Sequence, residues 1–247
     1  MHHLHVDPRG KFRLLGLLSR SAQDSARENL GLRGYGDVIR HFWTEWTFDR
    51  RHGVRTEYLI AADALDIPDP EARSHAERYR ATPPYCVATS LAHLSARLGS
   101  LGDRTLVDYG SGAGRVMIVA AEAGVGRVIG LELSPELARQ CDANLERYRA
   151  RRGERTSFEV RVADATAFVP PADATIFYFF HPFSAEFFER AMDNIRASVR
   201  ANPRVIYLKL FQTFRYTITD LDQIADVTGV QTYTNALRPE AFVDRSG

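Results

Sequence analysis

The C-terminal part of this 247-residue chain alternates short apolar runs, rich in β-branched and aromatic residues, with longer stretches of helical periodicity. The expected strands are 105–109, 127–132, 157–163, 175–180 and 204–211, and the expected helices are 114–123, 135–149 and 184–200. Strands that alternate with helices predict right-handed crossovers and an α/β fold, a doubly wound, mostly parallel sheet covered on both faces. Such a sheet binds ligands at the carboxyl ends of its strands, where the strand order reverses. Functional residues are therefore expected just after each strand.

The first 103 residues are less regular and predict a helical cap on a core that spans 104–247. Helices are expected at 11–29, 41–49 and 85–98, where apolar or aromatic residues recur at helical spacing. The second of these stretches, which contains Trp43 and Trp46, is either a helix docked on the core or a lid over a substrate pocket. As a lid, it would bring both tryptophans to the substrate. At the other end, 218–227 predicts a further helix, and 231–234 with 241–243 predicts a closing hairpin.

The charge of the chain is nearly balanced, with 32 basic and 31 acidic residues and a net charge of +1. It gives no general attraction for nucleic acid, which is therefore not an expected partner. Residues 147–155 hold five arginines and indicate either a solvated helix end or a nucleic-acid patch. Cys86 and Cys141 are too few for a disulfide framework or a four-thiolate zinc site, and no metal is expected. No apolar run reaches the roughly 18 residues of a membrane helix, so a cytoplasmic protein without membrane contact is expected.

A glycine-rich turn, Asp108-Tyr109-Gly110-Ser111-Gly112-Ala113-Gly114, follows the first expected strand of the core. A dinucleotide fingerprint needs glycines at offsets 0, 2 and 5. At offset 5 from the first two glycines stand Arg115 and Met117, so neither register fits. The spacing D-x-G-x-G-x-G instead resembles the first motif of the class I S-adenosylmethionine (SAM) dependent methyltransferases. That resemblance implies a Rossmann-like methyltransferase fold, with SAM as cofactor and S-adenosylhomocysteine as product.

The resemblance also implies roles for the residues of the turn. The backbone of Gly110, Ser111, Gly112 and Gly114 would approach the methionine part of SAM, because a Cβ there would collide with the ligand or forbid the turn. Asp108 would orient the amino group of the cofactor.

Further cofactor residues are expected after the next two strands. Glu132 ends the second strand, and a carboxylate there can accept hydrogen bonds from both ribose hydroxyls. By the resemblance, Leu133 would flank the adenine, Asp164 would meet its exocyclic amine, and the backbone of Ala165 would read a ring nitrogen. Asp164 has a second interpretation as a helix N-cap, which aspartate favours.

The fourth strand leads into His181-Pro182-Phe183, at the place where this family holds the transferable methyl group. Many members that methylate amines carry Asn or Asp, then Pro-Pro and an aromatic residue, and this sequence departs from that pattern. His181 is expected beside the cofactor as a general base or substrate-orienting residue, since its reference pKa lies near working pH. The alternative is that it only bonds the loop backbone. Phe183 is expected to form a wall of the substrate pocket.

A narrower resemblance, to bacterial class I methyltransferases of largely unassigned substrate, covers roughly 48–215. It is carried by 49–54, 79–83, the glycine turn, 131–135 and an aromatic-x-Pro-Phe motif. It implies that Tyr79 and Thr82 lie over the methionine end of SAM, with Tyr79 as a second polar group near the reacting atoms. The cofactor motifs also resemble those of non-SET histone lysine methyltransferases. The expected function is methyl transfer to a small molecule; the alternatives are a protein lysine methyltransferase and a non-catalytic SAM-binding module.

Overall fold

A seven-stranded sheet forms the centre of the computed structural model, which describes residues 35–57, 59–70, 73, 79–153, 155–180, 185–211, 218, 220–227 and 230–237. The strand order is β5-β4-β3-β6-β7-β9-β8. Every pair from β5 to β7 is parallel, and β9 is antiparallel to both of its neighbours. The strands are β3 (Thr105–Tyr109), β4 (Arg127–Glu132), β5 (Ser157–Val162), β6 (Ala174–Phe180), β7 (Tyr207–Phe211), β8 (Asp222–Val227) and β9 (Val230–Thr234).

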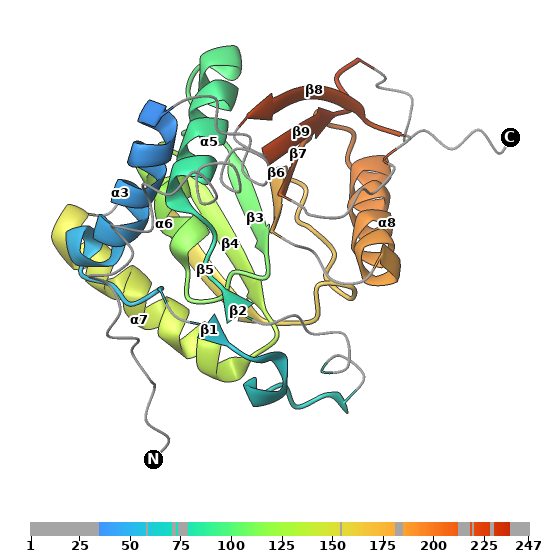
Figure 1. Cartoon of the computed structure of the whole chain (residues 1–247). Coiled ribbons are helices and arrows are strands. Elements are labelled where there is room, and N and C mark those ends of the chain that lie inside the picture. Colours follow the sequence, from blue (N-terminus) through green and yellow to red (C-terminus); the bar gives the residue numbers. More distant parts are fainter. Residues whose placement is uncertain are drawn as a thin grey trace, which may run out of the picture.

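Helices cover both faces of this sheet (Figure 1). On one face α5 (Pro84–Leu98), α6 (Arg115–Glu122) and α7 (Pro135–Arg152) pack on a core that includes Leu106 and Val128. On the other, α8 (Ala185–Ala201) packs on a second core with Val107 and Ile129. The alternation of side chains along a strand sends neighbours to opposite faces, so both cores are built from the same strands. The predicted α/β fold is confirmed.

The strand order reverses between β3 and β6. From β3 the chain moves outward to β4 and β5, and it then returns to β6 on the other side of β3. Asp108 and Tyr178 are register partners on these two strands. The carboxyl ends of β3, β4 and β6 therefore meet at the edge where a doubly wound sheet binds its ligand.

The predicted helix at 218–227 is wrong, because residues 222–227 form β8. This strand pairs antiparallel with β9, which in turn pairs with β7. Hydrogen bonds to β9 supply the backbone partners of an edge segment that has no continuous apolar run of its own. The predicted strand at 231–234 is confirmed within β9, but its partner is β8. Residues 241–243 lie outside the described residues, as does the predicted helix at 11–29.

The N-terminal segment contributes α3 (Tyr35–His52), the short strands β1 (Leu59–Ile60) and β2 (Tyr79–Arg80), and the 3-10 turn η2 (Ala62–Ala64). The helix expected at 41–49 is confirmed within α3. It lies beside α5 and α6, while β1 and β2 lie near the start of α7 (Figure 1). Within the described part of the chain, no helix combines the length and the apolar character needed to span a membrane. The division into a cap and a core at residue 103 stays a prediction.

Candidate functional site

The glycine turn begins where β3 ends and leads directly into α6. The amides of Gly110 and Ser111 both donate to the carbonyl of Leu131 on β4, at 2.9 and 2.8 Å. Gly110 has φ +88°, and a Cβ built there would meet no atom of the described residues within 4 Å. The turn is thus held from β4, and open space lies beside its first glycine.

Two buried carboxylates end the neighbouring strands β3 and β4. Glu132 accepts from the amides of Gly112, at 2.8 Å, and Ser134, at 3.0 Å. Asp108 is also buried, but its Oδ2 has no hydrogen-bond partner among the described residues. Burial, with the charge of Glu132 adding to it, raises the pKa of Asp108 to about 8. A buried carboxylate oxygen without a partner costs free energy, so one that finds none among the described residues is a candidate contact for a ligand group.

Tyr79 covers the glycine turn from the N-terminal segment. A Cβ at Gly112 would lie 2.2 Å from the Cε2 atom of Tyr79, so the ring packs directly on this glycine. The Tyr79 hydroxyl donates to the carbonyl of Thr56 at 2.8 Å. Thr82 is buried near the hydroxyl of Tyr178, whose pKa burial raises well above its normal value. Tyr79 therefore lies at the glycine turn, and the expected contacts of Tyr79 and Thr82 with the methionine end of SAM stay predictions.

The residues expected around the adenine lie after β4 and β5. Leu133 packs on a small cluster that also contains Leu65 and Ile67. The Asp164 carboxylate accepts from the amide and the hydroxyl of Thr166, each at 2.8 Å. Asp164 thus caps a turn, close to its second interpretation, although no helix follows. Ala165 is buried in the core beneath α8. The contacts of these residues with an adenine stay predictions.

Of the residues expected at the acceptor, the structure describes the two tryptophans of α3. Trp43 and Trp46 contact each other and are 61% and 51% exposed on α3. No contact of the described residues links them to the glycine turn, and their role stays a prediction. His181 and Phe183 lie outside the described residues.

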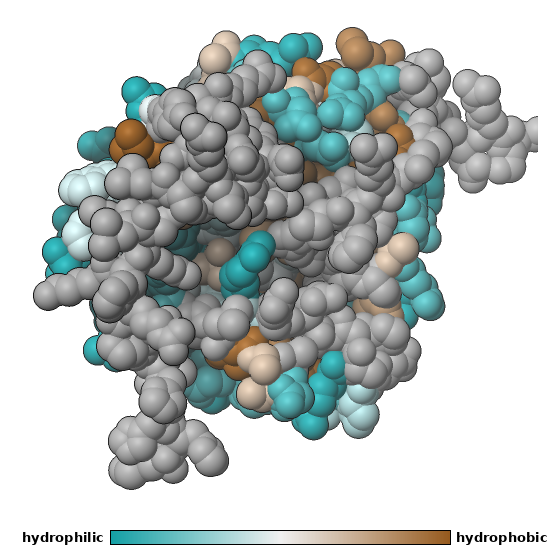
Figure 2. Space-filling model, in the orientation of Figure 1, coloured by the Kyte–Doolittle hydropathy of each residue, from teal (hydrophilic) through white to brown (hydrophobic). Residues whose placement is uncertain are grey.

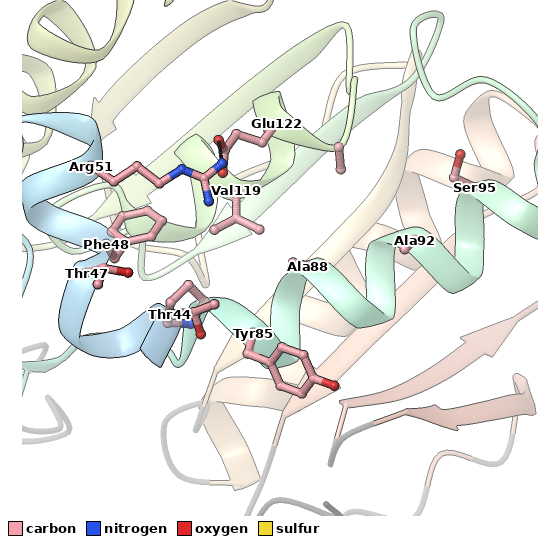
Figure 3. Close-up of a pocket in the computed structure, with 12 residues that line it drawn as sticks. Thr44, Thr47, Phe48, Arg51, Tyr85, Ala88, Ala92, Ser95, Val119 and Glu122 are labelled. Atoms are coloured by element: carbon pink, nitrogen blue, oxygen red, sulfur yellow. Dashed lines mark hydrogen bonds and ion pairs between the residues drawn. The ribbon is translucent and has the colours of Figure 1, made fainter. Parts of the chain in front are cut away.

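A groove of about 440 Å³ lies elsewhere, between α3, α5 and α6. Thr44, Phe48 and Arg51 line it from α3, and Arg51 pairs with Glu122 across it at 3.1 Å (Figure 3). Neither the glycine turn nor the two carboxylates line this groove. The site residues expected from the glycine turn and the two carboxylates thus lie at the strand ends and not in this depression.

Three residues near the turn did not emerge from the sequence: Arg115, Asn144 and Tyr178. Arg115 and Asn144 are buried and bond to the N-terminal segment, as described below. Tyr178 carries a local signal, because it lies in the apolar run of β6 and shares a face of the strand with residues 176 and 180. The structure adds that its register partner is Asp108. The others carry no local signal, since their partners are distant in sequence.

The strand order, the glycine turn and the two strand-end carboxylates together define the class I fold of SAM-dependent methyltransferases. The residues fit this cofactor: in the part of the chain that the structure describes, open space borders Gly110, and one Asp108 oxygen has no hydrogen-bond partner. Residues 106–202 match the model of a family described as a methyltransferase domain. The chain carries this domain and is a SAM-dependent methyltransferase.

Solved methyltransferase structures resemble the chain at low identity. An rRNA methyltransferase, AviRa from Streptomyces viridochromogenes, is 15% identical over 68% of this chain and 90% of that one, with a TM-score of 0.48. An RNA methyltransferase from Salinibacter ruber, solved with S-adenosylhomocysteine, is 21% identical over 63% and 92%, with a TM-score of 0.42. A methylase from Haemophilus influenzae is 18% identical over 60% and 88%, with a TM-score of 0.45. No curated protein sequence matches the chain.

The open space beside Gly110 leads to a prediction with an internal control. Gly110→Ala is expected to weaken SAM binding at least about tenfold, because its Cβ would enter that space. Gly124, at the end of α6, has a similar φ of +82° and equally open surroundings, so Gly124→Ala carries the same backbone strain away from the turn. Calorimetric titration with SAM is the measurement. Equal loss of affinity in both variants would assign the effect to backbone strain alone.

Proposed function

We propose that SAM binds along the carboxyl ends of β3 and β4, with its ribose on Glu132 and its amino group toward Asp108. The observation that carries this proposal is the buried Asp108 Oδ2, which has no partner among the described residues and lies beside the glycine turn. Each Glu132 oxygen accepts one backbone amide and keeps a lone pair for a ribose hydroxyl. The amides also hold the carboxylate in place before the ligand arrives.

When bound, the cofactor would supply a methyl group on a cationic sulfur. The acceptor would attack this methyl group in line with the carbon–sulfur bond, and S-adenosylhomocysteine would leave. The chain's own residues position the two reactants and exclude water, and this placement provides most of the acceleration. Tyr79 packs on Gly112 at the methionine end, so its ring would shield that side of the reacting atoms. His181, which follows the fourth strand of the sequence pattern, would accept the acceptor's proton where one is released, because the reference pKa of histidine lies near working pH.

We further propose a small molecule as the acceptor. Two arginines of the 147–155 run contact other residues of the fold: Arg147 donates to Asn144 at 3.1 Å, and the Arg149 guanidinium lies 5.2 Å from the Phe158 ring centroid. This run lies at the C-terminal end of α7, and the helix is about 27 Å long from its first residue, Pro135, to that end. On the face seen in Figure 2, hydrophilic and hydrophobic residues are interspersed among those described. The contacts and the position of these arginines support a site without a nucleic-acid track. Two of the similar structures are RNA methyltransferases, so RNA is an explicit outcome of the test.

The acceptor class can be tested with methyl-labelled SAM and an extract of the source organism separated by size. We expect label in the small-molecule fraction. Label that nuclease releases from the large fraction would establish RNA, and label that protease releases would establish a protein; either would overturn the small-molecule proposal.

Glu132→Gln is the matched control for this experiment. It keeps the size of the side chain, but one carboxylate oxygen becomes an amide that faces the backbone donors as another donor. We expect SAM affinity to fall about 100-fold, and labelling to fall with it. Unchanged affinity in Glu132→Gln, measured by calorimetry, would refute the cofactor placement.

A further inference from the structure

Arg115, the first residue of α6, is buried at the interface between the glycine turn and α3. Its side chain is 2% exposed. Nη1 donates to Glu45 of α3, Nη2 lies 3.7 Å from Asp49 Oδ1, and the guanidinium lies 5.2 Å from the Phe48 ring centroid. A buried arginine keeps its charge, so it needs these acidic partners to remain in place.

The same network continues to Tyr79 through Thr56. Arg115 Nε donates to Thr56 Oγ1 at 2.7 Å, and that hydroxyl donates to Asp49 Oδ1 at 2.5 Å. Asp49 Oδ2 accepts from the amides of Thr56, at 2.7 Å, and Glu57, at 2.9 Å. The carbonyl of Thr56 accepts the hydroxyl of Tyr79. One chain of bonds thus runs from the residue after the turn to the ring that covers the turn.

Asn144 of α7 braces this loop against the turn a second time. Its Oδ1 accepts from the amide of Arg55 at 3.0 Å, while its Nδ2 donates to the carbonyls of Arg55, at 2.8 Å, and Ala113, at 2.9 Å. Ala113 belongs to the glycine turn. The 55–56 loop is therefore fixed to the turn on one side and to Tyr79 on the other.

We infer that Arg115 is a positioning residue which, through Asp49 and Thr56, holds Tyr79 against the glycine turn and makes the N-terminal segment part of the SAM site. The inference rests on the proposed cofactor site. Ordering Tyr79 before SAM arrives removes an entropic cost from binding, so affinity depends on the network even though Arg115 does not touch the cofactor.

The test measures SAM affinity in Arg115→Lys, in Tyr79→Phe and in the double variant. Lysine keeps the charge but cannot reach Glu45, Asp49 and Thr56 together with one ammonium group. Tyr79→Phe keeps the ring and removes its bond to Thr56. The matched control is Arg196→Lys on α8, because Arg196 also pairs with an acid, Asp220, at 2.6 Å, but far from the turn in the fold.

Arg115→Lys is expected to weaken SAM binding by about tenfold and Tyr79→Phe by a smaller factor. The double variant is expected to bind about as weakly as Arg115→Lys alone, because both changes break one chain of bonds. Arg196→Lys should retain parental affinity whatever its melting temperature. Parental affinity in Arg115→Lys, or losses that multiply in the double variant, would overturn the inference.

Tryptophan fluorescence supplies a readout that a purely structural role would not move. The two tryptophans of the chain, Trp43 and Trp46, both lie on α3, the helix that also carries Glu45 and Asp49. SAM is expected to change their emission in the parent and in Arg196→Lys, and to change it less in Tyr79→Phe, which keeps the folded core. An equal change in Tyr79→Phe would count against the coupling. Glu132→Gln separates a failure of the proposed cofactor site from a failure of the positioning role. If Glu132→Gln keeps parental SAM affinity, the proposed cofactor site is wrong. If Glu132→Gln loses affinity while Arg115→Lys keeps it, only the positioning role of Arg115 is wrong.

Discussion

Asp108→Asn is expected to abolish detectable SAM binding while making the SAM-free protein more stable. The Asp108 carboxyl is buried, one of its oxygens has no hydrogen-bond partner in the described part of the chain, and burial raises its pKa to about 8. The ionised form of this carboxyl therefore costs free energy in the SAM-free protein, and the cofactor's ammonium would offset that cost. An amide carries no charge to desolvate, so folding without SAM improves by on the order of 2 kcal/mol, or about 5 °C in melting temperature.

The pH dependence of this gain has a definite sign. The pKa of Asp108 is raised from 3.8 in the unfolded chain to about 8 in the folded protein. The contribution of this carboxyl to the stability of the parent is therefore full below pH 4 and is lost as pH rises toward 8. The stability difference between Asp108→Asn and the parent should therefore grow from pH 5 to pH 8 and then level off. Thermal melts across this range measure it. Asp103→Asn, in an exposed loop, is the control and should follow the parent.

Cofactor binding should reverse the protonation of Asp108. A cationic amino group beside the carboxyl favours its ionised form, so SAM binding at pH 7 is expected to release a proton from the parent. Titration calorimetry in buffers of different ionisation enthalpy measures this release, and Asp108→Asn cannot supply it. Retained SAM binding in Asp108→Asn, or a stability difference that does not change with pH, would contradict the assigned role.

The central strands were predictable because they are buried on both faces. The expected bounds of β3 and β4, 105–109 and 127–132, are those of the structure. Parallel strands covered on both sides read as nearly continuous apolar runs, which local sequence reveals. Edge strand β8 is half-buried, and its pairing with β9 decides its conformation. That cause is tertiary, so periodicity over 218–227 predicted a helix instead.

The candidate site also has one part that local sequence predicts and one part that depends on contacts between distant residues. The glycine turn, Asp108 and Glu132 form a local pattern after two strands, and the structure places them at one edge of the sheet. The contacts of Arg115 with Thr56 and of Asn144 with Arg55 span 59 and 89 residues. One sequence without aligned relatives carries no signal for such pairs. The N-terminal segment therefore read as a separate cap, although it bonds directly to the turn.

Lys209 of β7 provides the second large prediction, this time on stability. Its side chain is fully buried, and its Nζ donates to the carbonyl and hydroxyl of Ser90 on α5 and to the Thr232 hydroxyl on β9, each at 2.9 Å. Lys11 is the other lysine of the chain, in which arginine supplies nearly all basic residues. Unlike arginine, lysine can become neutral when buried. Burial lowers the pKa of Lys209 to about 7.

Between pH 7 and pH 10 the unfolded chain holds a proton on Lys209 that the folded chain does not. The contribution of this lysine to stability is therefore full above pH 10.5 and is lost as pH falls toward 7, where it levels off. Relative to Lys209→Met, which cannot titrate, the parent is expected to gain about 1 kcal/mol per pH unit across this window. Lys209→Arg keeps its charge and should lose about 3–5 kcal/mol throughout. Urea unfolding from pH 7 to pH 10 measures all three, and other titrating groups cancel because every variant carries them. Parallel stability curves for the parent and Lys209→Met would mean that Lys209 stays charged in the core, held by three neutral oxygens alone.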